Sequence, residues 1–253
     1  MTNVFLVNRI TKITKKTLTK LTLKFNNLIM KITNFTTISA LISYASSQIS
    51  LLNLQKEDIN IAISGGKTPF IMFQDWKQNN ILDYTKTKIW QVDERYIEQT
   101  SELSNAGETI RLFDNLDFAK SFECVNTSLA YGESIDDYNK RLHQIINEQN
   151  NFDIVFLGFG TDGHFASIFP GDNTKFGEQL AIGTLAIKPY PVEKRITITP
   201  LCINLSDKII VILTGADKQR VLNEFLNGTL INSQFPCKIW KDHPKLEILT
   251  CFE

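Results

Sequence analysis

The sequence predicts a three-layer α/β/α fold, in which helices cover both faces of a mainly parallel, Rossmann-like sheet. Short β-branched apolar runs alternate along the chain with longer segments whose apolar residues recur at helical spacing. Glycines follow three of these runs, where the chain has to turn toward the next helix. The length of 253 residues and the hydrophobic fraction of 43% suit one large domain with a sizeable core.

The beginning of the chain differs from the remainder in its charge. No Asp or Glu precedes Glu57, whereas eight Lys and Arg residues do. A transit peptide or a nucleic-acid-binding arm would be basic in this way, but the segment shares the Lys, Asn, Ile and Thr bias of the whole chain. We therefore expect no nucleic-acid partner. Residues 1–29 are expected to be a poorly packed extension or an upstream start, and 30–253 to form a single domain that opens near Met30.

The predicted elements follow in order from this alternation. A helix is expected over 36–52 and a strand over 59–63, and the next helix is expected to have Thr68 as its N-cap and Pro69 as its first residue. Further strands are expected at 88–92, 153–157, 195–199, 208–213 and 246–251, and further helices at 106–113, 133–149 and from Gly215 to about 226. Ligands bind beyond the carboxyl ends of the strands in such sheets, so the residues that follow the strands are candidates for a site.

Composition argues against several classes of protein. No run of about 18 apolar residues occurs, so we expect neither a membrane span nor a membrane partner. The four cysteines form no Cys-x-x-Cys pair, which is typical of reduced thiols in a cytoplasmic protein. The three histidines lack metal-ligand spacing, so no metal site is expected.

The first candidate for a site is the turn over 64–69, which follows the predicted strand over 59–63. Gly65 and Gly66 let backbone amides approach a ligand, and the helix N-terminus behind them adds a partial positive charge. Lys67 adds a full charge, so the turn suits a phosphate, although it lacks the spacing of a Walker loop. A tight βα turn built of small residues is the alternative.

Three consecutive charged residues, Asp93, Glu94 and Arg95, follow the predicted strand over 88–92. Arg95 can hold a phosphate through two hydrogen bonds, and the two carboxylates can orient that Arg or bind sugar hydroxyls. A solvated rim is the alternative interpretation of these charges.

The most specific motif is the loop over 157–170, which contains an Asp-Gly-His sequence. His164 is the only histidine at a predicted strand end, and an imidazole can take a proton from water near neutral pH. Asp162 can hold the ring in one tautomer or stabilise the imidazolium. The glycines that would bring the backbone close to a ligand are Gly158, Gly160 and Gly163. A hydrogen-bonded structural histidine in a turn is the alternative.

A proline-punctuated loop over 188–194 leads into the predicted strand over 195–199. Lys194 and Arg195 can add positive charge to the same crevice. A surface loop with solvated basic residues explains the pattern equally well.

These four motifs, in this order, resemble those of the 6-phosphogluconolactonase family. The resemblance spans about 36–253 and is most specific in Gly-x-Gly-x-Asp-Gly-His-x-Ala-Ser-x-Phe-Pro at 158–170. The supporting motifs are Gly-Gly-x-Thr-Pro at 65–69, Asp-Glu-Arg at 93–95 with Ser-Asn at 104–105, and Arg-Ile-Thr-x-Thr at 195–199. The resemblance implies a fold like that of glucosamine-6-phosphate deaminase and ribose-5-phosphate isomerase. It also implies hydrolysis of 6-phospho-D-glucono-1,5-lactone to 6-phosphogluconate in the oxidative pentose phosphate pathway.

The resemblance also implies roles for individual residues. His164 would be the general base that activates water. From the residues themselves we further expect Asp162 to assist it and amides of the glycine loop to stabilise the oxyanion. The implied substrate-binding residues are Gly65, Gly66, Lys67, Thr68, Asp93, Arg95, Asn105, Gly160, Gly163 and Arg195. We expect no metal or organic cofactor, because a lactone is already activated, and we expect a monomer or a small homo-oligomer.

The chain departs from the family pattern in two places. The family's Val-Pro after Asp-Glu-Arg and its His-Pro-Asp before Ser-Asn are both missing from the stretch over 96–103. The family's Pro-Lys-Pro-Pro loop becomes 189–192, so that its Lys falls on Tyr190, with Lys188 two residues away. Which of these two residues takes over the phosphate contact of that Lys is left open.

Two other functions compete with the lactonase. An amino-sugar-phosphate deaminase of the same fold has Ile-Ala-Phe-Asn-Glu-Pro-Gly after its Asp-Gly-His and Tyr after its Asp-Glu, whereas this chain has Phe-Ala-Ser-Ile-Phe-Pro-Gly over 165–171 and Arg95. Both differences favour the lactonase. A non-catalytic sugar-phosphate sensor would keep the phosphate turn but would not need His164.

Overall fold

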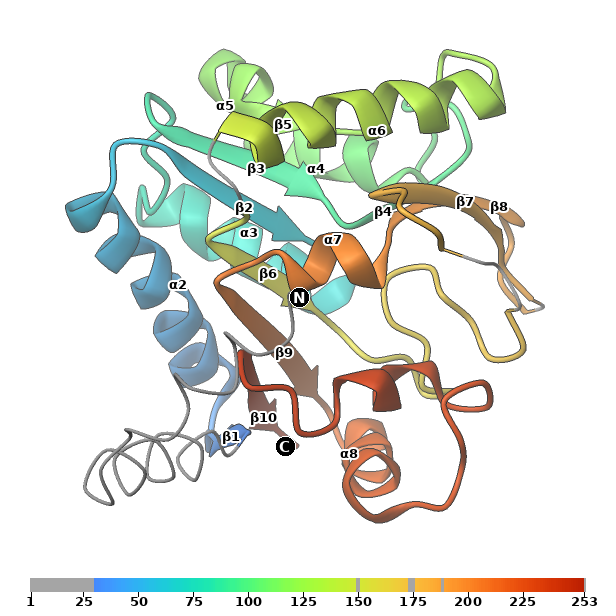
Figure 1. Ribbon diagram of the computed structural model, residues 1–253. Coiled ribbons are helices and arrows are strands. Elements are labelled where there is room, and N and C mark those ends of the chain that lie inside the picture. The colour runs from blue at the N-terminus through green and yellow to red at the C-terminus, as the bar shows by residue number, and fades with distance from the viewer. Residues whose placement is uncertain (1–29, 149–150, 173–175, 188, 253) are drawn as a thin grey trace, which may run out of the picture.

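The computed structural model describes residues 30–148, 151–172, 176–187 and 189–252 (Figure 1). The extension expected over 1–29 lies outside the described residues. The strands are β1 (Lys31–Asn34), β2 (Ile59–Ile63), β3 (Thr87–Gln91), β4 (Asp93–Arg95), β5 (Phe122–Glu123), β6 (Ile154–Leu157), β7 (Ala181–Leu185), β8 (Lys194–Ile198), β9 (Lys208–Thr214) and β10 (Leu246–Cys251). The helices are α2 (Ile38–Gln55), α3 (Lys67–Gln78), α4 (Asn105–Phe113), α5 (Leu116–Ser121), α6 (Tyr131–Glu148), α7 (Pro200–Asn204), α8 (Asp217–Asn227) and the 3-10 helix η2 (Pro236–Trp240).

A central sheet of seven strands has the order β1-β10-β9-β6-β2-β3-β5, and each neighbouring pair in it is parallel. Helices α2, α3, α4 and α5 pack on one face of this sheet, and α6, α7 and α8 pack on the other (Figure 1). The predicted three-layer α/β/α fold with a mainly parallel sheet is therefore confirmed.

The strands divide their apolar side chains between two cores, because successive residues of a strand point to opposite faces. In β2, Ile59, Ile61 and Ile63 pack in the core beneath α2 and α3, whereas Ala62 belongs to the core beneath α6 and α8. A shift of the strand by one residue would move all of these side chains to the wrong face. The two cores thus fix the register in which the carboxyl ends of the strands meet at one edge.

A second, smaller sheet with the order β4-β8-β7 lies beyond that edge (Figure 1). Its strands are antiparallel, and Arg95 of β4 stands opposite Arg195 of β8. The strand expected over 195–199 therefore exists, but its assignment to the βα alternation of the parallel sheet is wrong. The pairing of β4 with β8 brings two motifs together that are far apart in the sequence.

The start of α3 also differs from the prediction. The helix begins at Lys67, and its N-cap is Gly66, whose φ of 108° lies in the region that favours glycine. Thr68 is therefore not the N-cap, and its hydroxyl lies 2.7 Å from that of Thr214 at the end of β9. The remaining predicted strands and helices appear with bounds that differ by a few residues at most. The elements without a prediction, such as β1, β5 and α7, are short.

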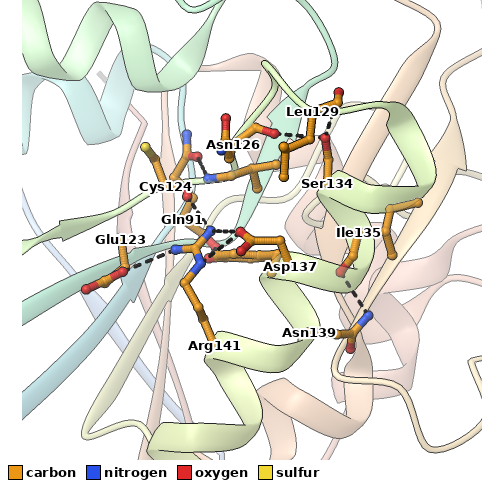
Figure 2. A network of polar contacts seen from close by, with 12 residues as sticks. Gln91, Glu123, Cys124, Asn126, Leu129, Ser134, Ile135, Asp137, Asn139 and Arg141 are labelled. Carbon is orange, nitrogen blue, oxygen red and sulfur yellow. Dashed lines mark hydrogen bonds and ion pairs between the residues drawn. The ribbon is translucent and has the colours of Figure 1, made fainter.

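A network of polar contacts fixes α6 against the β3 and β5 end of the central sheet (Figure 2). Arg141 of α6 donates hydrogen bonds to Glu123 at 3.1 Å and to the carbonyl of Cys124 at 2.8 Å. The side chain of Gln91, at the end of β3, accepts a hydrogen bond from the amide of Val125 at 2.9 Å. This network holds the strand that leads into β4.

Glu247 of β10 is the buried centre of a charge cluster near the β1 edge of the sheet. It is 3% exposed, and its carboxylate contacts Lys31 at 2.7 Å, Lys208 at 2.8 Å and Tyr44 at 2.8 Å. Burial by itself would raise the pKa of Glu247, but hydrogen bonds from these three side chains outweigh it and lower the pKa to about 2. The ionised carboxylate therefore stabilises the folded state at neutral pH.

We expect Glu247→Gln to destabilise the protein in a pH-dependent manner. Because the pKa is lowered on folding, the stabilisation is present above the ordinary value of 4.5 and is lost as the pH falls toward 2. Denaturant unfolding should show a difference from the wild type on the order of 3 kcal/mol at pH 7 that shrinks on acidification. The exposed Glu102→Gln should have little effect. A difference that is the same at all pH values would contradict this account.

Candidate active site

A cavity of about 520 Å³ opens at the carboxyl edge of the central sheet, where the small sheet adjoins it. Its size is that of a small-molecule site. Of the residues implied by the sequence, its wall contains Gly65, Gly66, Lys67, Thr68, Asp93, Arg95, Asn105, Gly160, His164 and Arg195. Asp162 and Gly163 lie in the same loop as His164 but are not part of this wall.

His164 is paired with Asp162 at the edge of the cavity. The ring Nδ1 lies 2.6 Å from Asp162 Oδ1. Burial by itself would raise the pKa of Asp162, but its hydrogen bonds with the ring and the amide of His164 outweigh it and lower the pKa. A Cβ atom at Gly160 would lie 2.0 Å from Nδ1. The contact between His164 and Asp162 therefore needs a glycine at position 160. The ionised Asp162 carboxylate holds the His164 ring by its Nδ1.

Three amides of the glycine loop donate to other groups of the same loop. The Gly160 amide donates to the carbonyl of His164 at 2.7 Å, and the Gly163 amide donates to the carbonyl of Gly160 at 3.0 Å. The His164 amide donates to Asp162 at 3.0 Å. The expectation that loop amides bind the oxyanion is therefore wrong for these three groups. Gly163 has a φ of 83°, and a Cβ there would lie 2.4 Å from the Phe235 ring, so the turn itself requires this glycine.

Arg195 is a buried cation without a carboxylate partner. Its residue is 4% exposed, and its Nε is buried without a hydrogen-bond partner. Among the residues that the structure describes, no carboxylate forms an ion pair with it. Burial lowers the pKa of the guanidinium, and the charge of Asp93 partly offsets this effect. A buried charge is costly unless it is paired, so Arg195 is suited to bind an anion that enters the cavity.

Glu94 has a different role from the one expected. It is 0% exposed and accepts hydrogen bonds from the amides of Arg95, Asn105 and Ala106 at 2.7, 2.9 and 2.7 Å. Burial raises the pKa of this carboxyl group, and these hydrogen bonds oppose the rise. Glu94 anchors the N-terminus of α4. The expectation that it orients the Arg95 side chain or binds sugar hydroxyls is therefore wrong.

Asp93, Arg95 and Asn105 do line the cavity. Asp93 accepts a hydrogen bond from the Ser167 hydroxyl at 2.5 Å, and Asn105 donates to the carbonyl of Asp93 at 3.2 Å. Arg95 is held on its other side by the carbonyl of Leu103 at 2.8 Å. The amide oxygen of Asn105 is buried without a partner. These groups are placed to meet a polar ligand from the β4 side.

The turn before α3 also lines the cavity, next to Asn105. A Cβ at Gly65 would lie 2.3 Å from the side chain of Asn105, so the turn and α4 approach each other too closely for a larger residue. Lys67 and Thr68 are the first two residues of α3, and amides in the first turn of a helix have no partner within the helix. The helix N-terminus therefore presents donors and a partial positive charge to the cavity.

Lys218 in the first turn of α8 is a cavity residue that the sequence reasoning missed. Its Nζ donates to the carbonyl of Phe159 at 2.8 Å. Burial lowers its pKa, and the charges of Asp217 and Asp162 act in the opposite direction. The available signal was a Gly turn after β9, at Gly215, followed by a Lys at the start of a helix.

Tyr190, the residue on which the Lys of the family's loop falls, lies in the loop before β8. It lines the cavity, and its Oη lies 3.2 Å from Nδ1 of His164. Lys188 lies outside the described residues. The cations that the structure places in the cavity wall are Lys67, Arg95, Arg195 and Lys218.

In the described ranges, no group of three or more His, Cys, Asp or Glu side chains gathers in a way that could hold a metal ion. The four cysteines are free thiols. The helices of the described part of the chain include none that is long and apolar enough to cross a membrane.

A family model described as glucosamine-6-phosphate isomerases/6-phosphogluconolactonase matches residues 34–248. The chain belongs to this family. Its relatives include a putative 6-phosphogluconolactonase of Caenorhabditis elegans, 31% identical over 191 residues, which cover 71% of this chain and 70% of that protein. A probable 6-phosphogluconolactonase of Dictyostelium discoideum is 30% identical over 182 residues, which cover 70% of this chain and 77% of the relative.

Solved structures share the fold of this family member. The 6-phosphogluconolactonase of Plasmodium vivax has a TM-score of 0.75 at 21% identity, covering 89% of this chain and 92% of the other. A monomeric glucosamine-6-phosphate deaminase has a TM-score of 0.74 at 18% identity, covering 88% and 97%. The fold predicted from the motifs is thus the one that these structures have. Because proteins of both names have this fold, the fold does not decide between the two activities, and the side chains that line the cavity have to do so.

For this family member we expect inorganic phosphate to bind in the cavity through Arg195. Phosphate should raise the melting temperature of the wild type, because a ligand that binds only the folded state stabilises it. In Arg195→Gln the affinity derived from this shift should fall at least about tenfold, as a charge-assisted contact is lost. Arg111→Gln removes an exposed Arg of α4 outside the cavity and should leave the shift unchanged. Equal phosphate affinity in Arg195→Gln and the wild type would contradict the assignment.

Proposed function

We propose that this protein hydrolyses 6-phospho-D-glucono-1,5-lactone to 6-phosphogluconate, the second step of the oxidative pentose phosphate pathway, as a single-domain enzyme of the cytoplasm. The observation that carries the proposal is the His164–Asp162 pair at a cavity that also contains the buried, unpaired cation Arg195. A phosphorylated ester needs a base at one end and an anion site at the other. The names of the relatives in C. elegans and D. discoideum point to the same reaction.

The phosphate is assigned to the cationic end of the cavity. Arg195 supplies the buried charge, Arg95 lies opposite it across the β4–β8 pair, and the first turn of α3 supplies amide donors. Lys67, in the first turn of α3, adds positive charge. Binding the phosphate here fixes the sugar ring, so that the distant C1 carbonyl is held in one place relative to His164.

The chemistry then needs one base. Asp162 occupies the Nδ1 side of His164, and no described group bonds Nε2. Nε2 takes a proton from a water molecule while the water oxygen forms a bond to C1. The tetrahedral intermediate collapses by breaking the bond between C1 and the ring oxygen, and the ring oxygen receives the proton from His164. Asp162 stabilises the imidazolium while it exists.

The negative charge that develops on the carbonyl oxygen needs a donor other than the amides of Gly160, Gly163 and His164, because these are already engaged. The cations of the cavity supply a positive potential for it. Lys218 is close enough to the pair for its charge to interact with that of Asp162. The reaction so described consumes only water and lactone, and it uses neither a metal nor an organic cofactor.

The residues after the Asp-Gly-His disfavour the deaminase alternative. The loop turns at Ala166, whose φ is 50°, and then presents Ser167 to Asp93 at 2.5 Å. The Asn-Glu pair of the deaminase motif is replaced here by apolar Ile168 and Phe169, which are both buried. Ammonia release from glucosamine 6-phosphate is the assay that would detect the alternative activity.

We expect His164→Gln to reduce kcat for lactone hydrolysis by about 10²–10⁴-fold, because it removes the group that carries the proton. Asp162→Asn should also reduce kcat, since a neutral amide no longer stabilises the imidazolium. Turnover is followed in a pH-stat, with the spontaneous hydrolysis of the lactone subtracted.

The matched control is His143→Gln, which makes the same change at an exposed position of α6 outside the cavity. It should turn over the lactone like the wild type. Turnover in His164→Gln equal to that of this control would refute the assignment of the base.

A further inference from the structure

Tyr190 contacts the base from a segment that lies outside the Asp-Gly-His loop. It belongs to the connection between β7 and β8, and its Oη lies 3.2 Å from Nδ1 of His164. The resemblance placed a phosphate-binding Lys at this position. A phenol that touches the base has a different effect from a Lys that touches the phosphate.

The donor and acceptor in this contact follow from the partner of His164. The Asp162 carboxylate can only accept a hydrogen bond, and it lies 2.6 Å from Nδ1, so Nδ1 carries the proton. The Tyr190 oxygen at the same nitrogen must then accept as well, as the longer arm of a shared hydrogen bond. The Asp162 contact selects the Nδ1–H tautomer, in which the lone pair of Nε2 is available to remove a proton from water. The Tyr190 contact helps to hold Nδ1 beside Asp162.

Aromatic rings limit the movement of the imidazole as well. Tyr190 meets it nearly perpendicularly, with ring centroids 5.5 Å apart and planes at 88°. Phe169 lies 5.0 Å from the same ring, and Phe169 and Tyr190 are 5.2 Å from each other. The three rings form one cluster, so a rotation of His164 away from Asp162 would displace two neighbours.

Burial is the main reason that the phenol of Tyr190 stays neutral. Burial raises the pKa of Tyr190, the charge of Asp162 adds to the rise, and Arg195 opposes it. The Arg195 guanidinium lies 6.0 Å from the centre of the Tyr190 ring. Asp162 in turn raises the pKa of Lys218 in α8, against the effect of burial.

We propose that Tyr190 is a positioning residue that holds His164 against Asp162 in the Nδ1–H tautomer. The kinetic consequence rests on the proposed function, whereas the contact and the tautomer do not. A phenol in this position stabilises His164 in its reactive form, whereas the Lys that the family has there would add a positive charge next to the phosphate.

The test compares Tyr190→Phe with the wild type in the full chain, because Phe keeps the ring and removes only the oxygen. Tyr96→Phe is the matched control, since it removes the same phenol oxygen from a tyrosine that makes one hydrogen bond, to the carbonyl of Leu129 at 2.8 Å, but lies outside the cavity wall. Nitrogen-15 NMR of histidine-labelled protein at about pH 8.5, well above the ordinary pKa of an imidazole, reports the tautomer of each ring. The His164 signal is identified by its loss in His164→Gln.

We expect the Nδ1–H tautomer of His164 to dominate in the wild type and in Tyr96→Phe. In Tyr190→Phe the ring is held less firmly beside Asp162, which selects the tautomer, so the ratio of the two tautomers should shift about fivefold toward Nε2–H. An unchanged ratio in Tyr190→Phe overturns the proposal. This measurement needs no substrate, so it stands even if the wild type fails to hydrolyse the lactone.

Lactone kinetics provide the second readout. In Tyr190→Phe, kcat should fall about fivefold while KM stays within about twofold, because the base and not the binding of the phosphate is affected. Tyr190→Lys, which introduces the residue that the family has at this position, should not bring kcat back to the wild-type value. An increase in KM with unchanged kcat would instead identify Tyr190 as a substrate-binding residue and overturn the positioning role.

Discussion

The guanidinium of Arg195 is buried in the wall of a cavity, and no carboxylate of the described residues forms an ion pair with it. Burying a charge in this way costs several kcal/mol unless a counter-ion is available. The surrounding fold tolerates the cost because β8 is held on both sides, by β4 and by β7. The unpaired charge makes the cavity suited to bind an anion. The roles proposed for the other residues of the site depend on an anion bound at this position.

The parallel sheet explains why the other groups of the site converge there. The turn over 64–69, the His164 loop and the turn before Lys218 follow β2, β6 and β9, and parallel strands bring their carboxyl ends to one edge. The small antiparallel sheet adds Asp93, Arg95 and Arg195 from the far side. Each element contributes one or two side chains, and two separate cores keep the strands in register. The arrangement depends on the register of the sheet more than on any single loop.

Much of this was predictable from the sequence. The central strands, the main helices and the place of His164 followed from apolar periodicity and from the glycine motifs, because these patterns are local. The antiparallel pairing of β4 with β8 was not predictable, since Asp93 and Thr197 are joined only through the tertiary fold. For the same reason the sequence could not show that the Glu94 carboxylate accepts hydrogen bonds from the N-terminus of α4, or that the amides of Gly160, Gly163 and His164 bond within their own loop. Lys218 and the contact of Tyr190 with His164 likewise required coordinates.

A crystal structure of the protein with 6-phosphogluconate would test the central claim most directly, because the product carries both the phosphate and the carbon that was attacked. The account predicts that the phosphate contacts Arg195 and that the C1 carboxylate lies within about 3.5 Å of Nε2 of His164. A product bound in the opposite direction, or with its phosphate away from Arg195, would contradict it.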